Sequence, residues 1–145
     1  MLRLRTLGTC AALAAGLIAA APAAAETIPF TSALSPANQV PPVDSRATGS
    51  AELLYETETR MLTWMITYSG LSSPATAAHI HGPAAPGQNA PPIITMTVLQ
   101  NPVVGTAALT EAQSEQLLGE LWYFNFHTPA FPGGELRGQI IPIAQ

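Results

Sequence analysis

Short runs of alternating apolar and polar residues constrain the fold of this chain most strongly. The clearest run extends from Leu121 to His127, where Trp122, Phe124 and Phe126 alternate with more polar residues. Successive side chains of a β-strand point to opposite faces of a sheet, so the three aromatic rings share one face. The run therefore predicts a strand whose aromatic face enters the core, and we expect Trp64 to be buried as well.

Similar runs recur along the chain between clusters of Gly and Pro. Residues 49–56 and 61–68 alternate on either side of a short polar connection and predict a β-hairpin. The segment Ile28–Phe30 predicts a short edge strand because Pro29 cannot donate a ladder hydrogen bond. Residues 134–143 predict the final strand.

One helix is expected, from Thr110 to Leu118. Thr110 and Gln113 fit a capping box, and Gly119 is placed to end the helix. Many short strands, frequent turn residues and one helix predict an all-β domain of about seven to eight strands. The expected architecture is a β-sandwich or barrel with Greek-key connections.

The N-terminal segment has the pattern of a secretory signal peptide. Basic residues at the start precede an apolar run from Thr6 to Ala21 and a small-residue site ending at Ala25. Cleavage there removes residues 1–25 and leaves residues 26–145 as a single domain. The protein is then expected in the periplasm or outside the cell.

The composition of residues 26–145 excludes several classes of function. Three arginines, Arg46, Arg60 and Arg137, stand against nine acidic residues, which gives a net charge of −6 and argues against nucleic-acid binding. The only cysteine, Cys10, lies in the expected signal peptide, so no disulfide and no thiolate ligand is expected. No later apolar run is long enough to span a membrane.

The three histidines of the chain predict a metal site. His79 and His81 are separated by one residue, so on a strand they share a face, about 7 Å apart. His127 ends another predicted strand. Three imidazoles that converge suit one metal ion, for which we expect these residues as the ligands.

The hairpin that follows His127 suggests what surrounds the site. In one register three pairs face each other: His127 with Glu135, Asn125 with Arg137, and Tyr123 with Gln139. Glu135 would then accept a hydrogen bond from the ring of a ligating histidine. The alternative is a surface ion pair between Glu135 and Arg137, worth under about 1 kcal/mol. The sequence favours neither.

Three motifs resemble the chordin-type, or CHRD, domain: Ala-His-Ile-His-Gly-Pro at 78–83, Trp-Tyr-Phe-Asn-Phe-His-Thr at 122–128, and Gly-Glu-Leu-Arg-Gly-Gln-Ile at 134–140. The resemblance extends from Thr31 to Ile140. It implies a module of the kind found in an extracellular growth-factor antagonist and in bacterial secreted proteins.

A weaker resemblance is to copper/zinc superoxide dismutase. It rests on the His-x-His-Gly segment, the late strand histidine, and Gly-Gly-x-Leu at 133–136. The resemblance implies a related β fold and matches His79, His81 and His127 to three copper ligands. No fourth histidine matches the one that bridges copper and zinc. Arg137 lies two positions later than an ungapped match of the C-terminus would place the active-site arginine of that enzyme.

Two classes of function follow from these observations. The first is an exported protein that binds one copper ion at His79, His81 and His127, as a redox-active protein that takes superoxide or another small oxidant, or as a copper-handling protein. Zinc held by three histidines and a water is the alternative metal. The second class is a non-catalytic protein-binding module whose histidines are structural. The sequence leaves the oligomeric state and any enzymatic turnover open.

Overall fold

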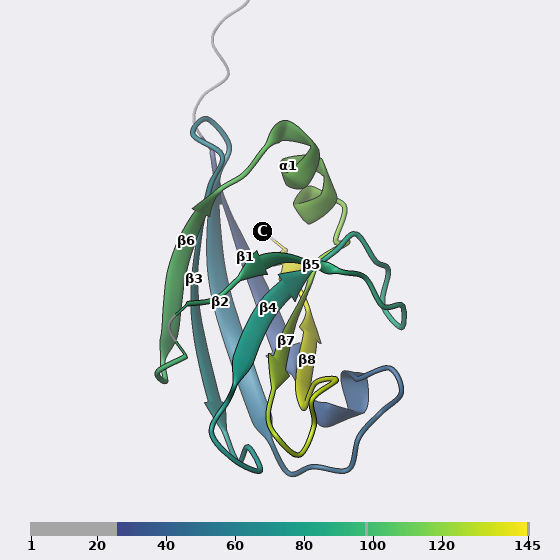
Figure 1. The fold of residues 1–145 in the computed structure, drawn as a ribbon. Coiled ribbons are helices and arrows are strands. Elements are labelled where there is room, and N and C mark those ends of the chain that lie inside the picture. The colour runs from purple at the N-terminus through teal and green to yellow at the C-terminus, as the bar shows by residue number, and fades with distance from the viewer. Residues whose placement is uncertain (1–25, 98, 145) are drawn as a thin grey trace, which may run out of the picture.

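Two antiparallel β-sheets pack face to face in the computed structural model, which describes residues 26–97 and 99–144 (Figure 1). The first sheet has the order β6-β3-β2-β1-β9 and the second the order β5-β4-β7-β8. The strands are β1 (Thr27–Leu34), β2 (Thr48–Glu56), β3 (Met61–Ser69), β4 (Ala77–His81), β5 (Pro92–Thr95), β6 (Val103–Ala108), β7 (Tyr123–His127), β8 (Leu136–Gln139) and β9 (Ile141–Pro142). The expected signal peptide lies outside the described residues.

The chain crosses between the two sheets after β3, β5, β6 and β8. The predicted all-β fold is confirmed, and its form is a sandwich of two separate sheets. Crossings over the ends of the sheets are the connections expected of a sandwich. They also bring β4 and β7, which are distant in sequence, next to each other in the second sheet (Figure 1).

The crossing from β6 to β7 contains the helix α1 (Glu111–Leu118), which lies over one end of the sandwich (Figure 1). The predicted capping box is confirmed: the Gln113 N–H donates to the Thr110 hydroxyl and the Thr110 N–H donates to the Gln113 side chain. A short 3-10 helix, η1 (Pro36–Asn38), follows β1. Within the described residues, no helix has the length and apolar character that crossing a membrane requires.

The alternating runs place their apolar residues between the sheets as predicted. Trp122, Phe124 and Phe126 are fully buried, and Trp64 is 7% exposed. The facing sheet contributes further large and fully buried side chains, which include Phe30, Leu62 and Ile66. The polar residues that alternate with these side chains therefore lie on the outer faces of the sandwich, where a site can form.

The prediction of an edge strand around Pro29 is wrong. β1 has eight residues and lies between β2 and β9. The Pro29 carbonyl accepts from the Ile143 N–H at 2.9 Å, so Pro29 faces β9 with the side of its backbone that lacks an N–H. β9 pairs with β1 only at Phe30 and Thr31, and the missing donor therefore costs no bond to β2.

The prediction of one continuous final strand is also wrong. The chain leaves the second sheet after Gln139 and joins the first sheet at Ile141. Ile140, between them, is fully buried and donates its N–H to the Trp122 carbonyl at 2.9 Å. Burial of this side chain between the sheets draws the chain from one sheet to the other.

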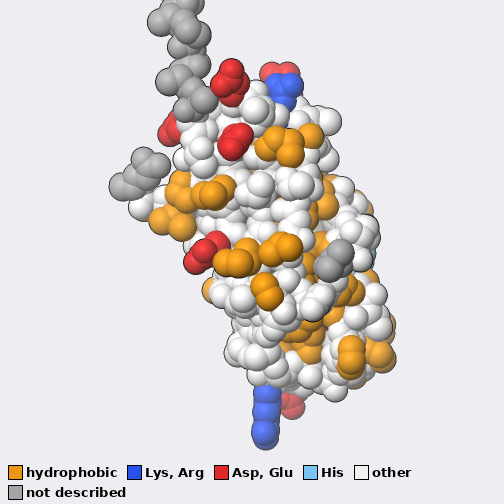
Figure 2. All heavy atoms as spheres, turned by 90° about the vertical axis from the view of Figure 1, so that its left-hand side faces the viewer, with side chains coloured by type: hydrophobic (Ala, Val, Ile, Leu, Met, Phe, Trp, Pro, Cys, Tyr) orange, Lys and Arg blue, Asp and Glu red, His pale blue; other side chains and the backbone are white. Residues whose placement is uncertain are grey.

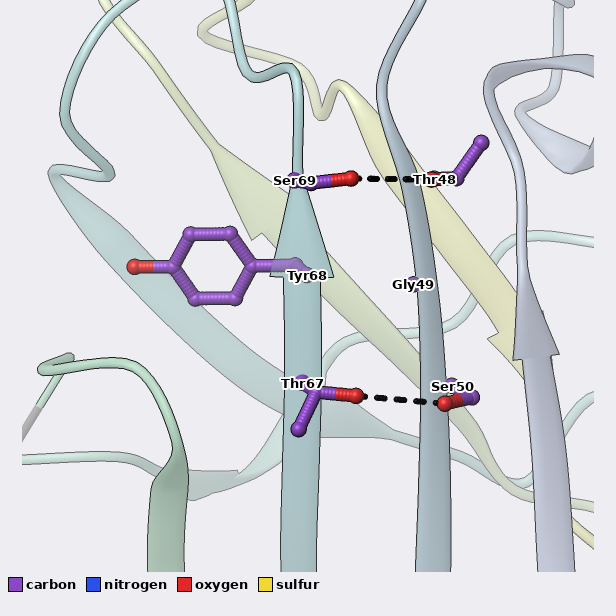
Figure 3. Close-up of a pocket in the computed structure, with 6 residues that line it drawn as sticks. All are labelled: Thr48, Gly49, Ser50, Thr67, Tyr68 and Ser69. Carbon is purple, nitrogen blue, oxygen red and sulfur yellow. Dashed lines mark hydrogen bonds between the residues drawn. The ribbon is translucent and has the colours of Figure 1, made fainter.

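The outer face of the first sheet presents hydrophobic side chains to solvent (Figure 2). Leu54, Met65 and Val104 are 51%, 45% and 58% exposed. At one end of the same face, hydroxyl groups of β2 and β3 pair across the strands and border a shallow pocket (Figure 3). These pairs are Thr48 with Ser69 and Ser50 with Thr67, each at 3.2 Å. The first sheet thus carries an apolar and hydroxyl-rich surface without histidines.

Gly105→Ala is expected to lower the free energy of unfolding by about 1–3 kcal/mol, the usual cost of overpacking a core. Gly105 pairs with Trp64, and a Cβ at this position would overlap the indole ring. Urea denaturation at equilibrium measures the change. Gly133→Ala is the matched control, because a Cβ there meets no atom within 4 Å. Equal stability of the two variants would contradict this packing.

Candidate metal centre

The three histidines lie together on the outer face of the second sheet. His79 and His81 share a face of β4, while Ile80 between them is fully buried. β7 runs antiparallel beside β4, with His79 opposite Asn125 and Ala77 opposite His127. His127 is therefore a diagonal neighbour of His79, a position from which cross-strand side chains reach each other.

The ring nitrogens of these histidines converge within the reach of one ion. The atoms that each histidine offers as a ligand lie within 4.8 Å of one another. Nδ1 of His79 is 3.1 Å from Nε2 of His127. Two nitrogens bound at 2.0–2.1 Å to one ion, at angles of 90–110°, are about 2.9–3.4 Å apart. The spacing of the His79–His127 pair thus fits a shared metal ion.

Two backbone carbonyls orient the rings. Nδ1 of His81 bonds to the Ala90 carbonyl at 2.8 Å, and Nδ1 of His127 bonds to the Pro132 carbonyl at 2.9 Å. A carbonyl only accepts, so both Nδ1 atoms are protonated, and in the neutral rings both Nε2 atoms are acceptors. Nε2 of His81 is buried and has no hydrogen-bond partner in the described part of the chain. Such an orphaned acceptor suits a metal ligand.

The surroundings favour the neutral imidazole at His79 and His81. Burial, followed by the charge of His127, lowers the pKa of His79. Burial also lowers the pKa of His81, and the hydrogen bond to Ala90 opposes this shift only in part. The charges of His79, His127 and Arg137 lower the pKa of His81 further. The neutral ring is the form that binds metals, so these lowered pKa values favour the ligand form of His79 and His81.

Without metal, the protein is expected to lose stability as the pH falls from 7.5 to 5.5. The pKa values of His79 and His81 are lowered in the folded state, so below their ordinary value of 6.5 the unfolded chain binds more protons. Stability from these two groups is therefore present above pH 6.5 and is lost as the pH falls toward their folded values. Urea midpoints across this range measure the effect, and a double His79→Gln, His81→Gln variant should show a weaker dependence.

Tyr123 and Asn125 lie beside the histidines on β7 and contact different groups. The Tyr123 ring stacks on His81, with centroids 4.9 Å apart and planes at 9°. The Asn125 amide accepts from the Gln39 side chain at 2.7 Å and donates to the Gly133 carbonyl. Tyr123 therefore contacts a candidate ligand, whereas Asn125 links the segments that contain Gln39 and Gly133 by hydrogen bonds.

The expected register of the last hairpin is confirmed for two pairs, Asn125 with Arg137 and Tyr123 with Gln139. The third expected pair, His127 with Glu135, is not formed, because β8 begins at Leu136. The contacts that Glu135 makes in the structure differ from the bond to a histidine ring that the sequence suggested. Its carboxylate accepts from Ser45, Ser72 and Thr128, and no bond to a histidine is present among the described residues. The hydrogen bonds that orient the rings come instead from backbone carbonyls.

The alternative of a surface ion pair between Glu135 and Arg137 is also wrong. Glu135 is fully buried and Arg137 is 2% exposed. The guanidinium lies 3.6 Å from the centre of the Tyr123 ring and donates to the Asn89 side chain and the Gln88 carbonyl. Both charged groups are thus held by neutral hydrogen-bonding partners from neighbouring loops.

Sequence reasoning missed the carbonyls of Ala90 and Pro132. Every residue has a carbonyl, so residue type carries no signal for this role. The only hint is position, since both carbonyls lie in Pro- and Gly-rich loops that follow a candidate ligand. Ser45, Ser72 and Gln39 were missed because their partners lie far away in the sequence.

Comparison with known proteins identifies the family. A family model described as the CHRD domain matches residues 30–140. This range includes all three histidines, Glu135 and Arg137. Comparisons with curated proteins and with solved structures gave no match. The likeness to superoxide dismutase stays a prediction from the sequence. The match covers most of the chain, and the protein belongs to the CHRD-domain family.

Proposed function

We propose that this protein is an exported copper-binding protein that holds one ion at His79, His81 and His127. The observation that carries the proposal is the convergence of three ring nitrogens, one of them buried without a partner. Export is part of the proposal and rests on the N-terminal sequence pattern and the CHRD family. Protein recovered from outside the cytoplasm should begin at Glu26.

The donor set favours copper over zinc. The site offers imidazole nitrogens, for which Cu(II) has the highest affinity among the divalent first-row ions. A hydrolytic zinc site would need a nearby base, and the Glu135 carboxylate is already bonded to three hydroxyl-bearing residues. Zinc remains the alternative metal.

Copper handling fits the electrostatics better than turnover of superoxide. Bound copper would supply one-electron redox chemistry, but fast capture of an anion also needs an accessible positive charge. Arg137 is 2% exposed and its guanidinium is directed to Gln88 and Asn89. We therefore expect a rate far below the diffusional ceiling of about 10⁹ M⁻¹s⁻¹, measured by pulse radiolysis of the copper-loaded protein.

The pair formed by His79 and His127 indicates how the site accepts an ion. His127 donates from Nδ1 to the Pro132 carbonyl, so its Nε2 accepts a hydrogen bond from the Nδ1–H of His79 across 3.1 Å. A metal ion between these two nitrogens would replace this proton, which His79 would then carry on Nε2. The site therefore needs only a change of tautomer at His79.

Titration of metal-free protein with Cu(II) and with Zn(II) tests this function. We expect one Cu(II) per chain, bound more tightly than Zn(II), with nitrogen hyperfine structure in the electron paramagnetic resonance spectrum. Tighter binding of Zn(II) would assign the site to zinc. Absence of stoichiometric binding of either ion would reject the metal function.

A protein-binding module is the second candidate function, favoured by the apolar outer face of the first sheet (Figure 2). Pro29, Leu54, Met65 and Ile143 border a groove there with a cavity volume of about 360 Å³. Exposed apolar surface of this kind often marks an interaction site. A photo-crosslinking residue in place of Met65 should then form one discrete adduct with a partner protein. The additional substitution Leu54→Glu should abolish this adduct and leave copper binding unchanged.

A further inference from the structure

Two buried charges near β8 have no partner of opposite charge among the described residues. Glu135 and Arg137 are separated by one residue, are at most 2% exposed, and bond only to neutral groups. Burial of an unpaired charge costs several kcal/mol, so a group kept in this state needs an explanation. The contacts of each residue lead to a different histidine.

Arg137 fixes the loop that orients His81. Its guanidinium donates to the Gln88 carbonyl and, at 2.8 Å, to the Asn89 side chain, directly before Ala90 in the sequence. The Ala90 carbonyl is the group that accepts from Nδ1 of His81. Arg137 thus holds the chain immediately next to the acceptor of this ring.

Arg137 also acts on His81 through Tyr123. The guanidinium covers one face of the Tyr123 ring and the His81 imidazole stacks on that ring. The Tyr123 hydroxyl donates to the Ala90 carbonyl at 3.2 Å and accepts from the Ala90 N–H at 3.1 Å. Stacking and hydrogen bonding therefore both tie His81 to the position of Arg137.

Glu135 plays the corresponding part for His127. Its carboxylate accepts from the Thr128 hydroxyl at 2.7 Å, and Thr128 is the residue after His127. Thr128 and Phe131 exchange backbone hydrogen bonds and so close the turn that carries Pro132. Bonds from Ser45 and Ser72 hold the carboxylate itself in place. Burial alone would raise the pKa of Glu135, but these hydrogen bonds outweigh it and lower the pKa, so the group is charged.

We propose that Arg137 and Glu135 are positioning residues that preorganise separate ligands, Arg137 through loop 82–91 for His81 and Glu135 through turn 128–132 for His127. This inference rests on the proposed metal function for its purpose, but its contacts are those of the metal-free protein. Outer partners of metal ligands fix the tautomer and orientation of the ring. Here Arg137 and Glu135 divide that task, and these oppositely charged residues form no ion pair with each other among the described residues.

The test uses metal-free protein and follows each histidine separately. Ring ¹⁵N chemical shifts distinguish protonated from unprotonated nitrogens, and in the wild type His81 and His127 should both be protonated at Nδ1. Arg137→Gln should give a mixture of tautomers at His81 and leave His127 unchanged. Glu135→Gln should do the reverse. Both should raise the dissociation constant for Cu(II) by roughly 10–100-fold.

Milder variants keep the test decisive if these two fail to fold. Asn89→Ala removes one partner of Arg137 from an exposed loop position, and Ser45→Ala removes one partner of Glu135. They should reproduce the selective changes at His81 and His127 in weaker form. Arg60→Gln and Glu58→Gln, exposed at the turn between β2 and β3, are the charge-matched controls and should change neither ring.

The test is decided by whether each variant changes the tautomer of only one of the two histidines. If His81 and His127 keep their tautomers in all the folded variants and Cu(II) affinity stays within twofold of the wild type, the positioning roles are wrong. If both histidines change equally in each variant, the residues only support general stability and the inference is also wrong. If the selective pattern appears but the wild type binds no copper, the positioning stands and the proposed metal function fails.

Discussion

His81→Ala is expected to lower the affinity for Cu(II) by about 10³-fold or more. Loss of an outer partner of a metal ligand typically costs 10–100-fold, and loss of the ligand itself should cost more. Nε2 of His81 is buried without a partner, and the carbonyl of Ala90 directs the ring by its other nitrogen. No other His, Cys, Asp or Glu among the described residues joins this cluster and could replace it.

Competition with a chromophoric chelator measures this change. Thr95→Ala is the matched control, because Thr95 is exposed and pairs with His79 on the same face without offering an imidazole. The His variants should keep the circular dichroism of a β protein, since the rings lie outside the core. Unchanged Cu(II) affinity and stoichiometry in a triple His→Ala variant would mean that the histidines are structural, as in the binding-module hypothesis.

Trp122→Ala is expected to lower the free energy of unfolding by about 3–5 kcal/mol. Trp122 is fully buried between the sheets, and its indole N–H donates to the Gln116 side chain of α1 at 3.2 Å. Its carbonyl accepts from Ile140, where the chain changes sheets. The substitution leaves a cavity and releases the helix from the sheet. A loss of this size is a large part of the about 5–15 kcal/mol by which domains are usually stable.

Equilibrium urea denaturation followed by circular dichroism measures the loss. Leu54→Ala serves as the control for removal of an apolar side chain, because Leu54 is 51% exposed on the outer face. It should change stability by no more than about 0.5 kcal/mol. A cost below 1 kcal/mol for Trp122→Ala would contradict the burial of this residue and its contact with α1.

Local pattern was sufficient for the alternating core strands, for the helix and for the shared face of His79 and His81. Alternation assigned Trp122, Phe124 and Phe126 to the core because the pleat of a strand fixes the face of each side chain. The capping box at Thr110 was readable because its two partners lie three residues apart. The same geometry placed His79 and His81 on one face of β4.

The surroundings of the site depended on contacts between distant segments. Asn125 bonds to Gln39, 86 residues away, and the Asn38 side chain reaches the carbonyl of Arg137 across 99 residues. Such contacts leave no periodicity in the sequence, so neither the burial of Arg137 nor the partners of Glu135 followed from a correct register. The position of β1 inside the sheet likewise did not follow from local sequence, because it depends on the pairing of β9 with β1.

The sequence by itself determined which faces of the strands are apolar and which face carries the histidines. The tertiary structure alone decided what covers that face and which carbonyls orient the rings. The physical reason is that side-chain direction along a strand is a local property of two or three residues. The pairing of loops with a sheet is instead decided by how the whole chain closes around its core.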